Sequence, residues 1–183
     1  AMADEIEIKL RLPPDRVDQF KRAPILRALA QTRPRTRQLS SVYFDTPKRD
    51  LRSLGGALRI RHMGKQRIQT LKLPADDPSG LQSFHEFEQP VAGDVTAAAA
   101  LKERVDIRDL APVFSTEIRR TVWPVEFEGS RIDVALDSGE IRAADLAMPV
   151  CEVELELKAG DTQRLGGLAL ALNGEAPAAW EFD

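Results

Sequence analysis

The stretches EIEIKLRL and CEVELELK carry a charged residue at every second position, and these charges indicate the chemistry available to the chain. Side chains two residues apart share one face of a β-strand. Carboxylates at that spacing lie within about 7 Å of one another, which is destabilising unless a cation neutralises them. Grouped carboxylates suit hard cations such as Mg²⁺ or Mn²⁺, and Lys and Arg suit phosphate oxygens. Rows that hold both signs therefore predict a polyanion bound together with a divalent metal.

The same alternation recurs in ALRIR, TLKL, FHEFE, TEIRRTV and RIDVALD. For a single strand, the simplest interpretation is a solvated face with cross-strand salt bridges. The rows are almost purely ionic, however, so for the whole set we favour strands whose charged faces surround a shared cavity while their aliphatic faces pack outward under helices. This candidate face holds the bases Lys9, Arg11, Arg59, Arg61, Lys72, Arg119 and Lys158, and the acids Glu5, Glu7, Glu86, Glu88, Glu117, Asp133, Asp137, Glu152, Glu154 and Glu156.

Length and composition describe an ordinary globular chain. Its 183 residues suffice for about one domain, with 43% apolar and 30% charged residues. The formal net charge of −3 argues against a general nucleic-acid binder, although a local basic pocket remains compatible with it. No apolar run approaches the ~18 residues of a membrane span, and the N-terminus has no apolar signal-peptide core. We expect a cytoplasmic protein that binds neither membrane nor nucleic acid.

The cysteine and histidine residues of the chain favour neither a zinc site nor a thiol enzyme. Cys151 is the only cysteine, which excludes an internal disulfide and favours a reducing compartment. No histidine lies near it in a recognisable pattern, and we expect His62 and His85 to be surface or hairpin residues rather than metal ligands. Ala1 precedes Met2, so we set it aside as foreign to the natural chain.

Periodicity predicts a mainly β chain of the α+β class. Helices are expected within 15–31 (interrupted at Pro24), 95–106, 107–112 and 161–174, and strands at 5–12, 35–46, 57–64, 66–74, 84–91, 115–127, 130–143 and 149–158. About eight strands imply a predominantly antiparallel sheet. Alternation alone leaves open whether this sheet closes into a barrel or stays open.

The ordered motifs resemble the CYTH superfamily, the triphosphate tunnel metalloenzymes. The motifs are ExExK at 5–9, YFDT at 43–46, LRIR at 58–61, TLK at 70–72, ExE at 86–88, Arg119, VALD at 134–137 and ExExExK at 152–158. The match covers nearly the whole chain and is nearest to the bacterial inorganic triphosphatase branch. It implies a single CYTH domain over residues 2–183. It also implies the triphosphate tunnel fold, an eight-stranded antiparallel β-barrel with a few flanking helices and a charged lumen.

The resemblance also implies roles for individual residues. Glu5, Glu7, Glu152, Glu154 and an aspartate of the pair Asp133 and Asp137 would hold Mg²⁺ or Mn²⁺. The triphosphate would be bound by Lys9, Arg59, Arg61, Lys72, Arg119 and Lys158. Lys9, Glu7 and Glu154 would be catalytic. The chain departs from the family at Phe84, where relatives of this branch usually carry an arginine, and it shows no lysine-bearing tail segment after the last helix.

These features predict metal-dependent hydrolysis of a small-molecule triphosphate, first of all inorganic tripolyphosphate to diphosphate and phosphate. Class IV adenylate cyclase and thiamine triphosphatase are alternatives with the same signature, slightly disfavoured because only 5% of residues are aromatic. A non-catalytic module that binds polyphosphate or nucleotide is a third alternative, supported by Phe84 and the missing tail motif. The sequence leaves the preferred metal and the oligomeric state open.

Overall fold

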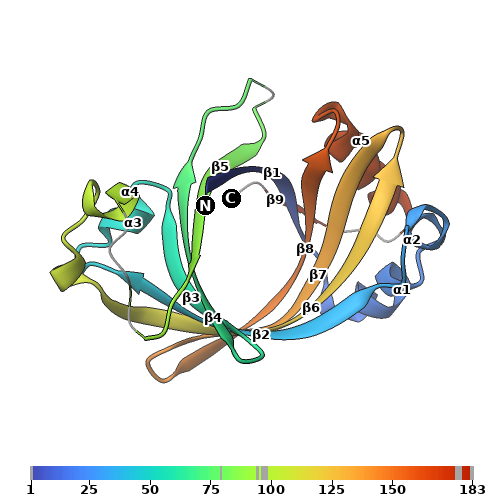
Figure 1. The fold of residues 1–183 in the computed structure, drawn as a ribbon. Coiled ribbons are helices and arrows are strands. Elements are labelled where there is room, and N and C mark those ends of the chain that lie inside the picture. The colour runs from blue at the N-terminus through green and yellow to red at the C-terminus, as the bar shows by residue number, and fades with distance from the viewer. Residues whose placement is uncertain (1, 79, 94, 96–98, 176–178, 182–183) are drawn as a thin grey trace.

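Eight antiparallel strands form a closed barrel, seen nearly end-on in Figure 1. The computed structural model of the chain describes residues 2–78, 80–93, 95, 99–175 and 179–181. Around the barrel the strands follow the order β5, β4, β3, β2, β6, β7, β8 and β1, and pairing between β1 and β5 closes the ring. The predicted barrel is therefore confirmed, and the open-sheet alternative is excluded.

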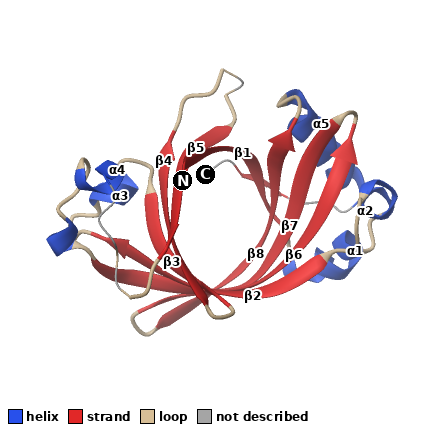
Figure 2. Cartoon of the chain, in the orientation of Figure 1, coloured by secondary structure: helices blue, strands red, loops and turns tan. Residues whose placement is uncertain are grey.

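Strands β6, β7 and β8 are longer than the five strands that precede them. Their bounds are β1 Met2–Arg11, β2 Arg35–Asp45, β3 Ala57–Met63, β4 Gln66–Pro74, β5 Gln82–Pro90, β6 Ala111–Phe127, β7 Ser130–Ala143, β8 Leu146–Ala159 and β9 Ala179–Glu181. The helices are α1 Val17–Lys21, α2 Pro24–Leu29, α3 Asp50–Ser53, α4 Ala99–Lys102 and α5 Gln163–Glu175, with single 3₁₀ turns at Pro14–Arg16 and Ile107–Asp109. All helices lie outside the barrel wall (Figure 2).

Two elements were not expected from the sequence. Strand β9 pairs with residues 9–11 of β1, next to the segment of β1 that pairs with β5. Helix α3 follows β2 and begins just after the YFDT motif. Within the predicted helix at 95–106, the structure is helical at α4, and residues 96–98 lie outside the described residues.

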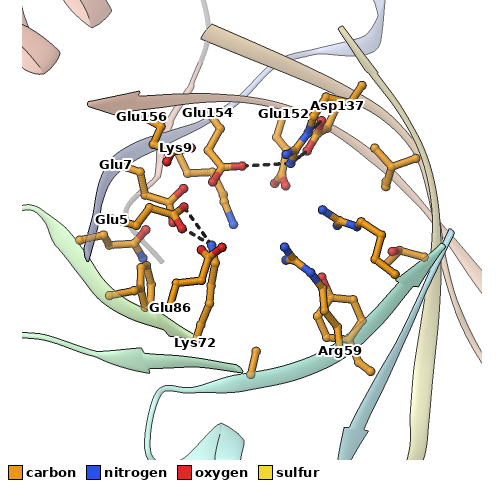
Figure 3. Close-up of a pocket in the computed structure, with 18 of the residues that line it drawn as sticks. Glu5, Glu7, Lys9, Arg59, Lys72, Glu86, Asp137, Glu152, Glu154 and Glu156 are labelled. Atoms are coloured by element: carbon orange, nitrogen blue, oxygen red, sulfur yellow. Dashed lines mark hydrogen bonds and ion pairs between the residues drawn. The ribbon is translucent and has the colours of Figure 1, made fainter. Parts of the chain in front are cut away.

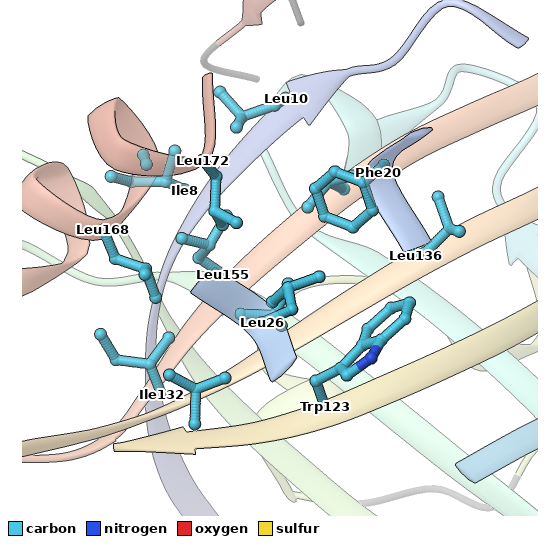
Figure 4. Close-up of a cluster of buried hydrophobic side chains, with 14 of the residues drawn as sticks. Ile8, Leu10, Phe20, Leu26, Trp123, Ile132, Leu136, Leu155, Leu168 and Leu172 are labelled. Carbon is cyan, nitrogen blue, oxygen red and sulfur yellow. The ribbon is translucent and has the colours of Figure 1, made fainter. Parts of the chain in front are cut away.

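The larger hydrophobic core lies between the outer face of the barrel and helices α1, α2 and α5 (Figure 4). Ile8 and Leu155 point outward from their strands and are 2% and 0% exposed. Phe20 of α1 meets Trp123 of β6 edge to face, with ring centroids 5.9 Å apart. Burying each such side chain stabilises the fold by about 1.5–3 kcal/mol. The aliphatic faces of these strands therefore serve the core, as the alternation predicted, and their opposite faces are left for the lumen.

A smaller core under α3 and α4 covers β3 and β4. The YFDT motif anchors this side, because the Asp45 carboxylate accepts hydrogen bonds from the backbone N–H groups of Thr46, Leu51 and Arg52 at 2.8, 3.0 and 3.1 Å. These bonds satisfy donors at the start of α3 that the helix itself leaves unpaired. Asp45 is thus a structural residue of the motif. No helix among the described residues is long and apolar enough to cross a membrane.

Candidate active site in the barrel lumen

The barrel encloses a cavity of about 580 Å³ to which all eight of its strands contribute side chains. Its lining is dominated by charged residues of both signs: Glu5, Glu7, Lys9, Arg59, Arg61, Lys72, Glu86, Glu88, Arg120, Asp137, Glu152, Glu154, Glu156 and Lys158. We call this space the central cavity. Charges grouped in an enclosed space interact more strongly than on an open surface, because little water screens them.

Three carboxylates form the most compact acidic group in the central cavity. Each of Glu5, Glu7 and Glu154 offers one oxygen, and these oxygens lie within 4.8 Å of one another. The alternation of β1 and its register with β8, in which Lys9 pairs with Glu154, bring them together. Glu7 is only 2% exposed, and its Oε2 is buried without a hydrogen-bond partner. An unpaired buried carboxylate oxygen beside two further carboxylates is a donor set that fits a hard divalent cation.

Lys72 of β4 reaches across to this acidic group (Figure 3). Its Nζ lies 3.0 Å from Oε1 of Glu5 and 3.7 Å from Oε1 of Glu7, and 5.1 Å from the ring centroid of Phe84. One ammonium group therefore offsets part of the charge of two carboxylates, and it lies where it could equally contact a phosphate bound beside them.

Burial and mutual repulsion distribute the protons among these carboxyl groups. Burial raises the pKa of Glu7 above its ordinary value. Burial and hydrogen bonds with Glu5 and Glu88 raise the pKa of Glu86 to about 9. The pKa of Glu5 falls despite burial, because the hydrogen bond from Glu86 and the charge of Lys72 stabilise its carboxylate. Glu86 therefore holds the proton of the pair that it forms with Glu5.

Three arginines lie on the wall formed by β3 and β6. Arg61 is 9% exposed and donates from Nε to Oγ of Ser41 at 2.8 Å. Burial, together with the charge of Arg59, lowers the pKa of Arg61 to about 10. The Nε of Arg59 is buried and has no hydrogen-bond partner. Arg120 donates to both oxygens of Asp137 at 2.8 Å. Apart from that pair, this wall carries an excess of positive charge that suits an anion.

Two aromatic rings adjoin the arginine wall. Tyr43 of β2 stacks on Phe114 of β6, with centroids 4.5 Å apart and planes inclined by 14°. Despite burial, which acts in the opposite direction, the charges of Arg59 and Arg61 lower the pKa of Tyr43. The stack holds the Tyr43 ring in place beside these guanidinium groups.

Comparison with known proteins agrees with this geometry. The model of the CYTH domain family matches residues 3–172. The chain belongs to the CYTH family. An inorganic triphosphatase of Haemophilus influenzae is 34% identical over 173 residues, which cover 90% of this chain and 48% of that protein. The chain thus spans about half the length of this curated relative.

Solved structures share the fold of this CYTH domain. A Hippeastrum protein described as a candidate adenylyl cyclase with dominant triphosphatase activity superimposes with a TM-score of 0.64, at 24% identity, covering 97% of this chain and 90% of its own. A candidate adenylate cyclase from Bacillus halodurans gives a TM-score of 0.67 at 20% identity, covering 100% and 95% of the two chains. At these identities the likeness establishes the barrel.

Most residues predicted from the sequence line the central cavity of this CYTH domain. They are Glu5, Glu7, Lys9, Arg59, Arg61, Lys72, Asp137, Glu152, Glu154 and Lys158. Asp133 does not line it: the residue lies on the same face of β7 as Asp137, but four positions away. There the charges of Glu156 and, to a lesser extent, Asp133 raise the pKa of Lys158 despite burial, which acts in the opposite direction. Of the two aspartates, Asp137 is therefore the one in the cavity.

The prediction for Arg119 was wrong in its placement. Arg119 is exposed on the outside of the barrel, as is Glu117, which accepts a hydrogen bond from Ser40 there. The sequence pattern placed Ile118 on the outward aliphatic face of its strand, and therefore Glu117 and Arg119 on the lumen face. In the structure Ile118 lines the cavity. The lumen position belongs to Arg120, the next residue along β6.

Five ionisable residues among the described lumen lining were not assigned a role from the sequence: Tyr43, Glu86, Glu88, Arg120 and Glu156. A signal for Arg120 exists in the chain. Trp123 and Val125 are large apolar residues two positions apart, which marks their face of β6 as the one under the helices. Counting back in twos places Arg119 on that outward face and Arg120 on the lumen face. Glu86 and Glu156 lie in the alternating motifs and share the face of their assigned neighbours.

Proposed function

We propose that this CYTH domain hydrolyses inorganic tripolyphosphate to diphosphate and phosphate, with Mg²⁺ or Mn²⁺ as cofactor. One observation carries the proposal: a single enclosed cavity joins the Glu5, Glu7 and Glu154 cluster to the excess positive charge of Arg59 and Arg61. A short, highly charged phosphate chain with a bound cation matches both halves of that cavity. The likeness to an inorganic triphosphatase supports the same substrate.

The acidic group would hold the metal. Glu5, Glu7 and Glu154 offer converging oxygens, and Glu152 and Asp137 lie in the same cavity as further donors. When bound there, a divalent cation supplies charge neutralisation for phosphate oxygens and lowers the pKa of a coordinated water. Several of these groups also contact basic side chains in the structure: Glu5 contacts the ammonium of Lys72, and Asp137 and Glu154 contact the guanidinium of Arg120.

The basic residues would bind and orient the phosphate chain. Arg59 and Arg61 present guanidinium groups from neighbouring positions of β3, and a guanidinium can contact two phosphate oxygens at once. Lys72 and Lys9 reach the cavity from β4 and β1. Phosphoryl transfer depends mainly on such positioning and charge stabilisation, so no nucleophilic side chain is required.

In addition to its part in the metal site, Glu7 would accept a proton from an attacking water. Burial raises its pKa, which makes it a stronger base than an ordinary carboxylate. None of the described residues donates a hydrogen bond to the Oε2 atom of Glu7.

The arrangement of aromatic rings favours an inorganic substrate over adenosine or thiamine triphosphate. Tyr43 already stacks on Phe114, and Phe84 carries the Lys72 ammonium over its ring. At least one face of each ring is therefore used by the protein itself. An organic triphosphate would have to find its stacking surface on the remaining faces.

Release of orthophosphate from tripolyphosphate, measured with and without Mg²⁺ or Mn²⁺, tests the proposal. ATP and thiamine triphosphate serve as parallel substrates, with chromatographic detection of cyclic AMP and thiamine diphosphate. Glu5→Gln should abolish metal-dependent release. Glu117→Gln is the matched control, since it removes a carboxylate from the outer face of the barrel. It should retain the activity of the original protein.

Three results would contradict the proposal. Tripolyphosphate that binds without release would indicate a non-catalytic module. Cyclic AMP or thiamine diphosphate formed faster than orthophosphate from tripolyphosphate would identify an organic substrate. Equal activity of Glu5→Gln and Glu117→Gln would show that the lumen carboxylates are not used.

A further inference from the structure

The lumen continues beyond Arg61 and Arg120 into a second cavity of about 290 Å³. Arg61 and Arg120 line both cavities, so the two spaces meet at these guanidinium groups. Arg35 and Arg37, near the start of β2, complete its polar lining. The remaining lining residues are apolar: Leu39, Met63 and Val122. We call this second cavity the arginine mouth.

The strand register brings like charges together in the arginine mouth. In the pairing of β2 with β6, Arg37 lies directly opposite Arg120, and Arg35 follows on the same face. Like charges in directly opposed positions destabilise a sheet. Asp137 offsets the charge of Arg120 through its paired hydrogen bonds. Neither Arg35 nor Arg37 forms an ion pair within the described part of the chain.

Carboxylates are concentrated elsewhere in the barrel. The acids of the central cavity come mainly from β1, β5 and β8, whereas the arginine mouth is built from β2, β3 and β6. No acidic side chain lines the arginine mouth within the described residues. Buried Arg61, crowded by Arg59, already has a lowered pKa. Guanidinium groups that share a cavity without an acidic residue in its lining are stabilised when an anion binds among them.

We infer that the arginine mouth is a second phosphate subsite, which binds the far end of a linear polyphosphate too long for the central cavity alone. The inference rests on the proposed function, because the other end of that chain would lie in the central cavity. Guanidinium groups suit successive phosphates, since each can donate two parallel hydrogen bonds to phosphate oxygens. The subsite binds the chain only, so no bond is made or broken there.

The lining of the arginine mouth favours polyphosphate over a nucleic acid. Proteins that bind single-stranded nucleic acids combine basic grooves with aromatic side chains on which the bases stack. The arginine mouth has no aromatic residue among its described lining. Free inorganic phosphate offers the same chemistry as the end of a chain, and the experiment separates these two sources.

Binding is measured by calorimetry in EDTA, which prevents metal-dependent turnover. The ligands are tripolyphosphate, a longer linear polyphosphate of defined length, and orthophosphate. The proteins are the original chain, Arg35→Gln/Arg37→Gln, and the control Arg22→Gln/Arg119→Gln. The control also removes two exposed positive charges, but neither of its residues lines the central cavity or the arginine mouth.

The measured quantity is the ratio of the affinities for the longer chain and for tripolyphosphate. We expect a ratio of about tenfold or more for the original chain, from additional charged hydrogen bonds. Arg35→Gln/Arg37→Gln should lower the ratio to less than about twofold, because those contacts are lost. The control should keep the ratio of the original chain. Since the substituted side chains are exposed, urea denaturation should confirm that all three proteins fold.

A ratio near one in the original chain would overturn the inference, as would a ratio that Arg35→Gln/Arg37→Gln leaves unchanged. An equal loss in the control would assign the preference to overall charge and would also overturn it. Orthophosphate binding that depends on Arg35 and Arg37, without tighter binding of the longer chain, would make the mouth a site for free phosphate instead. Phosphate release is measured in a separate assay with metal. If the longer polyphosphate binds tightly only when Arg35 and Arg37 are present, but the protein releases no phosphate, the subsite is supported and the proposed function is rejected.

Discussion

Replacing Arg120 with alanine should destabilise the barrel far more than the same change at its neighbour Arg119. Arg120 donates to both oxygens of Asp137 at 2.8 Å and lies 3.4 Å from Oε2 of Glu154. The Asp137 side chain is 7% exposed, so its carboxylate would lose the hydrogen bonds from Arg120 and remain buried. Arg119 projects outward and is exposed.

The expected size follows from the burial of the pair. An exposed ion pair contributes about 0.2–1 kcal/mol, whereas removing one partner of a buried pair costs about 3–5 kcal/mol. The Arg120 side chain is 28% exposed, which places the pair between these limits. Loss of Arg120 also relieves Arg61 of a like charge, which offsets part of the cost. We expect Arg120→Ala to lower the free energy of unfolding by about 2–3 kcal/mol, and the melting temperature by about 7 °C.

Urea denaturation followed by circular dichroism measures the difference directly. Arg119→Ala is the matched control and should change the free energy of unfolding by less than about 0.5 kcal/mol. Adding Asp137→Asn to Arg120→Ala should recover part of the loss, because a neutral amide is easier to bury than an unpaired carboxylate. Equal destabilisation by the two alanine variants would refute the assignment of Arg120 to the lumen.

Three further predictions concern the metal, the protons and the backbone. Glu7→Gln should weaken Mg²⁺ or Mn²⁺ binding at least about tenfold in calorimetry, because it removes a negatively charged donor. Glu86 has a folded pKa of about 9 against 4.5 ordinarily, so its contribution to stability is present at low pH and is lost as pH rises between these values. Urea midpoints of the metal-free protein should therefore fall across that range relative to Glu86→Gln. Gly139→Ala should destabilise by about 1–3 kcal/mol, since its new methyl group would overlap the carbonyl oxygen of Glu117. Gly166→Ala meets nothing within 4 Å on α5 and should stabilise by about 0.5–1 kcal/mol, which urea denaturation also measures.

Strict alternation made the barrel wall predictable. In residues 5–11 of β1 and 152–158 of β8 every second residue is aliphatic, and Ile8 and Leu155 do face the outer core. Because the alternation is unbroken, one buried residue fixes the orientation of the whole strand. Glu7 and Glu154 are each one position away from an outward residue, so they must face the lumen.

In β6, assigning side chains to a face from the alternation of apolar and charged residues gave the wrong result. In β6, Ile118 lies between charged residues and resembles the outward aliphatics of β1, but it faces the lumen. An aliphatic residue between two charged neighbours therefore gives no certain indication of which face of the strand it occupies. The orientation of β6 is set instead by Trp123, whose large ring needs the space beside Phe20. Such tertiary packing between distant segments lies outside what a strand's own pattern specifies.

Some contacts depended on the closure of the barrel. The approach of Lys72 to Glu5 joins β4 and β1, which are neighbours of β5 on opposite sides. The arginine mouth likewise arises from the register of β2 with β6, which places Arg37 opposite Arg120. Sequence patterns reveal which face each side chain occupies, but register depends on turns and on the fit of the whole ring. The second cavity could therefore be recognised only in the folded barrel.

Stability and function are separated in space by this construction. The apolar residues that hold the barrel lie outside it, under α1, α2 and α5, whereas the lumen is lined mainly by charges that repel or desolvate one another. Burial opposes the ionisation of lumen groups: it raises the pKa of Glu7 and lowers that of Arg61. These charges do not stabilise the barrel, so its stability comes from the outer core. Neutral substitutions inside the barrel should therefore be tolerated by the fold more often than those under the helices. When a cation and a phosphate chain fill the lumen, the crowded charges become favourable. The cation then attracts the carboxylates, and the phosphate oxygens attract the Lys and Arg side chains.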